Sequence, residues 1–148
     1  MFDLRLILAG LCAAAPLPAM ARPAVMLDSA IFIEHSGAAH GTPSRMIEPA
    51  QNFTRGERVV TLVSWTVAAG RGGFTVVNAL PPALAWQKSA DGTEEVSVDG
   101  GRSWGRLEDL RVGTRRATPE DVTHVRWHIS PQQALVGAGR IAYAGFVR

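Results

Sequence analysis

The chain has 148 residues, enough for one ordinary domain with a core of its own. Fifteen basic and thirteen acidic residues leave a net charge of only +2. The arginines are scattered, and Arg115 and Arg116 form the only adjacent basic pair. A nucleic-acid-binding surface needs clustered cations, so the composition argues against nucleic acid as a partner.

The amino terminus, residues 1–21, has the parts of a secretory signal peptide. A weakly positive start precedes an apolar run from Leu6 to Ala15, and Ala19 and Ala21 form a small-x-small cleavage site after two prolines. The run is too short for a membrane-spanning helix of about 20 residues. We therefore expect an exported protein, periplasmic or extracellular, without a transmembrane segment in a mature chain that begins at Arg22.

The only cysteine, Cys12, lies inside this predicted signal. A lipoprotein signal places a small residue directly before the acylated cysteine, whereas Leu11 stands there, so we do not expect lipidation. Cleavage after Ala21 would leave a chain without disulfides or thiol chemistry. Its stability would then depend on the packed core.

The first half of the mature chain contains one long strand pattern. We expect residues 22–30 to be a tether and residues 31–148 to form a single β-sandwich domain. Ile31–Glu34 is a short strand candidate, and the Gly and Pro residues of His35–Pro49 indicate a loop. Arg58–Ala69 carries apolar residues on both faces at its start, which is typical of a central strand.

The second half alternates short strands with turns. Phe74–Asn78, Leu84–Gln87 and Arg140–Val147 are strand candidates, and His124–Ile129 has the clearest alternation of apolar and polar residues. Thr118–Asp121 has the form of a single helical turn. About seven strands without a long amphipathic helix predict an all-β, immunoglobulin-like antiparallel β-sandwich. A partly open β-barrel is the alternative.

A β-hairpin is predicted around a turn rich in glycine. The strand pattern that ends at Val98 leads into Asp99, whose carboxylate can bond nearby amides, and into two glycines. The spacing of Ser97, Asp99, Gly101 and Trp104 resembles the Asp-box motif, S-x-D-x-G-x-x-W, of sialidases and other β-propellers. In those families the motif is a structural hairpin away from the catalytic centre. The resemblance implies a structural role here, in a chain too short for a propeller.

A second resemblance covers residues 31–148. The segments Val76–Asn78 with Leu80–Pro82, the strand Val122–Trp127, and the closing Gly-rich turn and strand resemble the bacterial conserved repeat domain family, the domain of unknown function numbered eleven. That family consists of exported, immunoglobulin-like modules of envelope and surface proteins. The resemblance implies a fold and a compartment, without a defined activity.

Candidate catalytic and metal-binding patterns are weak. His124 and His128 are four residues apart, which on a strand is about 13 Å and too far for both to bind one zinc ion. Adjacent carboxylates such as Glu94 and Glu95 face opposite ways on a strand. The chain contains no nucleophile elbow, P-loop or dinucleotide fingerprint. We therefore expect no enzyme activity, no catalytic or metal-binding residues and no cofactor.

The leading hypothesis is a structural or interaction module that contacts another envelope or surface protein. One alternative is a carbohydrate-binding module that uses an exposed tryptophan near the hairpin. A small hydrolase using scattered histidines and carboxylates is the least supported. We expect the four tryptophans to lie in the core or over the hairpin, and the carbohydrate-binding alternative needs one of them at the surface: Trp65, Trp86, Trp104 and Trp127.

Overall fold

A computed structural model describes residues 25–39, 42–49, 52–68 and 72–148. The predicted signal peptide, with Ala19 and Ala21, lies outside the described residues. Among the residues that are described, no helix is long and apolar enough to cross a membrane.

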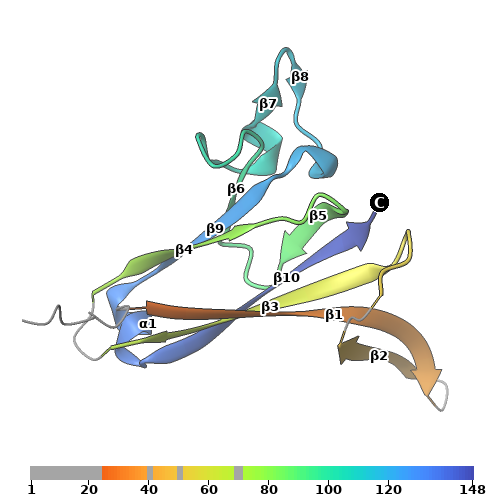
Figure 1. Ribbon diagram of the computed structural model, residues 1–148, viewed down its shortest axis with the longest axis horizontal. Coiled ribbons are helices and arrows are strands. Elements are labelled where there is room, and N and C mark those ends of the chain that lie inside the picture. Colours follow the sequence, from red (N-terminus) through yellow and green to blue (C-terminus); the bar gives the residue numbers. More distant parts are fainter. Residues whose placement is uncertain (1–24, 40–41, 50–51, 69–71) are drawn as a thin grey trace, which may run out of the picture.

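The described chain forms two antiparallel sheets that pack face to face (Figure 1). The larger sheet contains, in spatial order, β2 (Thr42–Pro49), β1 (Val25–Ala39), β3 (Arg58–Val67), β10 (Ala138–Val147) and β5 (Leu84–Ser89). The smaller sheet contains β4 (Phe74–Ala79), β9 (His124–Ile129) and β6 (Glu95–Ser97). The predicted all-β sandwich is therefore confirmed, and the described strands do not close into a barrel.

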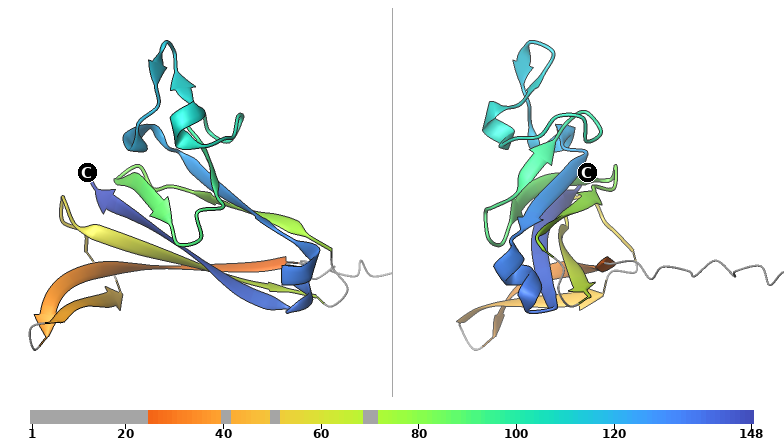
Figure 2. Two further views of the ribbon diagram at one scale, coloured as in Figure 1. Left: turned by 180° about the vertical axis from the view of Figure 1, so that it is seen from behind. Right: turned by 90° about the vertical axis from the view of Figure 1, so that its left-hand side faces the viewer.

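A two-stranded ribbon and three short helices complete the described chain. The ribbon projects beyond the smaller sheet (Figure 2). In chain order these elements are η1 (Leu107–Asp109), β7 (Arg111–Val112), β8 (Arg115–Arg116), η2 (Pro119–Asp121) and α1 (Pro131–Leu135). The single turn predicted at Thr118–Asp121 is the 3₁₀ helix η2.

The start of the domain differs from the prediction. The predicted tether, residues 22–30, is part of strand β1 from Val25 onward, because this stretch pairs with β3. The segment 35–49, predicted as a loop, contains the end of β1 and all of β2. Pro43 and Pro49 are tolerated there because β2 is an edge strand, where an amide can be missing without loss of a ladder bond.

Helix α1 is a second difference. The sequence predicted only that Ser130 and Pro131 end the preceding strand. The Ser130 hydroxyl accepts a hydrogen bond from the Gln133 amide at 3.2 Å, and the Gln133 side chain accepts one from the Ser130 amide at 2.8 Å. This capping box, with proline at the first helical position, starts one short helix before β10.

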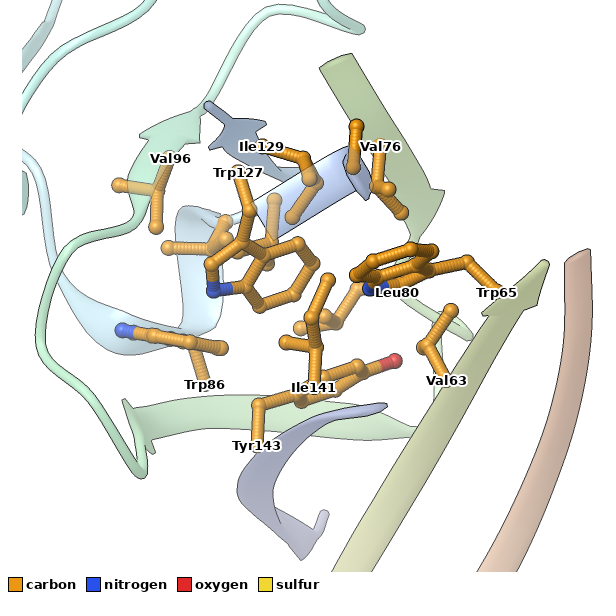
Figure 3. Packing of buried hydrophobic residues seen from close by; sticks show 13 residues of the cluster. Val63, Trp65, Val76, Leu80, Trp86, Val96, Trp127, Ile129, Ile141 and Tyr143 are labelled. Atoms are coloured by element: carbon orange, nitrogen blue, oxygen red, sulfur yellow. The ribbon is translucent and has the colours of Figure 1, made fainter. Parts of the chain in front are cut away.

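The core lies between the smaller sheet and the β3, β10 and β5 side of the larger one. Tyr143 of β10 packs against two indole rings, 5.7 Å by ring centroids from Trp86 of β5 and 5.7 Å from Trp127 of β9 (Figure 3). Each ring of this size buries on the order of 150–250 Å². The contact between Tyr143 and Trp127 therefore joins the two sheets by burying a large apolar area. Further members of the core are Val63, Trp65, Val76, Leu80, Val96, Val125, Ile129 and Ile141.

The smaller sheet does not cover the whole of the larger one. None of the buried residues of this core cluster comes from β1 or β2. Met26 and Leu27 of β1 are 63% and 51% exposed. The amino-terminal half of β1 therefore forms an exposed margin of the larger sheet.

Gly139 provides a test of this packing. It lies opposite Trp65 in the β3–β10 register, and a Cβ atom there would overlap the indole ring. We predict that Gly139→Ala lowers the free energy of unfolding by about 1–3 kcal/mol through overpacking, measured by urea denaturation. Gly72→Ala is the matched control, because a Cβ there meets nothing within 4 Å. Equal denaturation midpoints for the two variants would contradict the packing described.

Candidate functional site

The outward face of β9 carries the polar side chains that the sequence singled out. Along this strand the buried residues Val125, Trp127 and Ile129 alternate with the outward residues His124, Arg126 and His128. The register places Glu95 of β6 opposite Arg126, and Thr75 of β4 opposite His128. Three strands therefore contribute to one polar surface.

Glu95 is the centre of a hydrogen-bonded cluster on this surface. Its Oε2 accepts a bond from Arg126 Nε at 2.7 Å and lies 3.0 Å from His128 Nε2. The other ring nitrogen of His128 lies 3.1 Å from the Thr75 hydroxyl. Hydrogen bonds from Arg126 and then His128 lower the pKa of Glu95. A carboxylate that is paired and ionised in this way is poorly suited to donate a proton at neutral pH.

The hairpin turn is organised by the carboxylate of Asp99. Its Oδ1 accepts bonds from the Ser97 hydroxyl at 2.7 Å and from the amides of Arg102 and Ser103 at 3.0 and 2.9 Å. Its Oδ2 accepts the Ser103 hydroxyl at 2.6 Å. The Gly101 amide donates to the Ser97 hydroxyl at 2.9 Å. Gly101 has a φ of +88°, which favours a residue without a Cβ.

Trp104 lies over this turn. Its indole Nε1 donates to the Gly101 carbonyl at 3.0 Å. The Arg126 guanidinium carbon lies 4.6 Å from the centre of the ring, and the His124 ring meets it edge to face at 6.4 Å. The structure thus brings the motif residues together in one turn and joins that turn to the polar face of β9.

Thr123 ties the hairpin to the start of β9. Its amide and hydroxyl both donate to the Ser97 carbonyl, at 2.8 and 3.2 Å, and its hydroxyl accepts the Gly100 amide at 3.0 Å. Ser97 is completely buried as a result. Sequence reasoning missed Thr123 and Ser103, because neither is a fixed position of the motif. Their short hydroxyl side chains beside a glycine turn were the available signal.

The two histidines are not brought to a common site. His124 lies 3.1 Å from the Thr123 hydroxyl and against Trp104, whereas His128 belongs to the Glu95 cluster. Within the described ranges there is no group of three or more His, Cys, Asp or Glu residues that could hold a metal ion. The arrangement stabilises a strand face and does not converge on a reacting atom.

A sugar-binding platform needs an aromatic ring with a free face. Trp65, Trp86 and Trp127 are between 1% and 5% exposed. Trp104 is partly exposed, but Arg126 stacks on its ring. A sugar ring stacking on that face would have to displace a cation that Glu95 also binds.

No protein-family model, curated protein or solved structure matches this chain. The resemblance to the bacterial conserved repeat domain stays a prediction from the sequence. The function of the chain is therefore inferred from its own residues and geometry.

The acid stability of the protein tests the role of Asp99. Hydrogen bonds from Ser103, and then from Ser97, hold the pKa of this carboxylate well below its ordinary value. Because the unfolded chain binds a proton more readily than the native one, Asp99 stabilises the fold fully above the unfolded pKa of about 3.9. This contribution is lost as the pH falls below that value. We predict that Asp99→Ala lowers the urea midpoint at pH 7 and flattens its decline between pH 4 and pH 2.

Asp109→Ala is the control, since Asp109 is exposed and its side chain makes no hydrogen bond within the described chain. It should leave both the midpoint and the acid slope close to those of the unmodified protein. Some acid slope should remain in Asp99→Ala, because hydrogen bonds from Arg115 also lower the pKa of Asp121. An acid slope in Asp99→Ala that equals the wild-type slope would show that Asp99 does not organise the turn.

Proposed function

We propose that this chain is an exported, non-catalytic β-sandwich module that acts through contacts with other proteins in a bacterial cell envelope. The observation that carries this proposal is the uncovered amino-terminal half of β1. Leu27 exposes an apolar side chain on the face that continues the core side of the larger sheet, and Met26 exposes one on the opposite face. Large apolar side chains left in solvent on both faces of one strand offer a surface for another protein.

The polar groups support the same proposal. Glu95, Arg126 and His128 bind one another, and Asp99 binds the backbone of its own turn. These groups are used to stabilise the smaller sheet and its hairpin. The carbohydrate-binding alternative is less well supported because Arg126 occupies a face of Trp104. The hydrolase alternative is less well supported because His124 and His128 have separate partners.

The compartment is proposed from the sequence alone. Residues 1–21 carry the signal pattern, with the small residues Ala19 and Ala21 at the cleavage site. The resemblance of residues 31–148 to exported envelope modules agrees with that pattern. Neither observation names the partner.

Site-specific photo-crosslinking in living bacteria tests the proposed function. A photoreactive residue at Leu27 should crosslink reproducibly to an envelope protein, which mass spectrometry identifies. A photoreactive residue at Arg102, exposed on the hairpin turn, is the control and should not capture that protein. The processed chain should begin at Arg22 and fractionate with the envelope or periplasm.

Two results would contradict the proposal. One is a free monomer that gives no specific crosslink from Leu27 in the envelope. The other is a cytoplasmic chain that retains Met1. The variant Ala21→Leu places a large residue at the predicted cleavage site and should block processing. Loss of the Arg22 amino terminus in this variant would show that processing depends on that site.

A further inference from the structure

The edge of β1 that faces away from β3 is only partly occupied. On that side β2 pairs with Phe32–Ala39, whereas Val25–Ile31 pair with β3 alone among the described strands. An unpaired strand edge directs backbone N–H and C=O groups outward, where they can pair with another strand. Figure 1 shows this half of β1 running past the end of β2.

This open edge carries little of the protection found on edges left to solvent. Proteins protect exposed edges with charged side chains, especially lysines, and with prolines or bulges. Val25–Ile31 contains no lysine, proline or bulge, and residues 26–30 are all exposed. Its one charge is Asp28, at the centre, which makes no hydrogen bond or ion pair within the described chain.

A second copy of this chain is a poor occupant of the edge. Antiparallel pairing of Val25–Ile31 with itself about a two-fold axis places Asp28 opposite Asp28, and like charges directly opposite destabilise a sheet. With the axis nearer Ile31, Met26 of one copy would lie opposite Phe32 of the other, whose edge is already paired with β2. With the axis nearer Val25, fewer residues would pair and Met26 would lie opposite the carboxylate of Asp28.

We propose that the open edge of Val25–Ile31 binds an extended strand of another protein, with a basic residue opposite Asp28 and apolar residues on either side. This inference rests on the proposed function and names the surface and the kind of partner. An antiparallel strand would satisfy the free backbone groups of β1, and a cation would pair with Asp28 across the strands.

The two faces of β1 set the side-chain pattern of the partner. Val25, Leu27 and Ile31 share the face that continues the core side of the larger sheet, since Leu27 lies opposite Trp65 of β3. Asp28 lies on the other face. The added strand therefore carries apolar residues at alternate positions on the first face and its cation on the second.

The experiment uses a designed probe, the peptide acetyl-Val-Thr-Val-Lys-Val-Thr-Val-amide, and a matched peptide with Glu in place of Lys. Each is titrated into the isotopically labelled protein, purified from the compartment in which it accumulates, and followed by backbone amide chemical shifts. The Lys peptide should shift amides of Val25–Ile31 and of the facing part of β3. The Glu peptide should bind about three- to tenfold more weakly, as expected when an attractive cross-strand pair is replaced by a repulsive one.

Variants of Asp28 show whether the protein recognises the charge of the peptide or binds either peptide nonspecifically. Asp28→Lys should reverse the preference between the two peptides, and Asp28→Asn should remove most of it with little change in side-chain volume. Glu108→Lys makes the same change in net charge on the exposed helix η1, away from β1, and should leave the preference unchanged. The unliganded amide spectrum shows whether each variant is folded.

The proposal is overturned if the Lys peptide shifts no amide of β1, if it shifts a different surface, or if the Asp28 variants leave its preference unchanged. Sedimentation equilibrium of the protein alone should show a monomer. A dimer with contacts that map to Val25–Ile31 would make the second copy the occupant and would also overturn it. An envelope crosslink from Leu27 without peptide binding would leave the proposed function standing while rejecting strand addition.

Discussion

Tyr143 of the larger sheet joins the two sheets by packing against Trp127 of the smaller sheet and against Trp86 beside it. The three rings come from β10 and β5 of the larger sheet and from β9 of the smaller one. They lie far apart along the chain, and the pairing of the last strand with β3 and β5 places Tyr143 at the contact. The only cysteine lies within the predicted signal, so a processed chain would depend on such apolar contacts in place of disulfides.

The position of this contact also leaves part of the larger sheet uncovered, and the proposed function depends on that part. The three-stranded sheet is centred on these rings and covers β3, β10 and β5, whereas β1 lies beyond it. The uncovered half of β1 is therefore a consequence of unequal sheets rather than a separate addition to the fold. The hairpin around Asp99 belongs to the opposite side of the core, where Thr123 fixes it to β9.

Alternation of polar and apolar residues was the reliable signal in the sequence. It predicted β3 and β9, which are buried on at least one face. It missed the strands over residues 25–30, 35–39 and 42–49, because pairing with β3 and within the β1–β2 hairpin overrides the glycines, prolines and small residues there. The spacing from Ser97 to Trp104 predicted a turn. The cluster of Glu95, Arg126 and His128 could not be predicted, because it depends on the register between three strands that are distant along the chain.

We expect the open edge of β1 to be vacant in the isolated protein and occupied in the envelope. Amide hydrogen exchange of Val25–Ile31 tests it most directly, by comparing the purified protein with the same protein in isolated envelopes. Those β1 amides that point away from β3 should exchange rapidly in the purified protein and become protected in envelopes, while the exchange of β9 stays the same. Equal exchange of Val25–Ile31 in both samples would contradict strand addition at this edge.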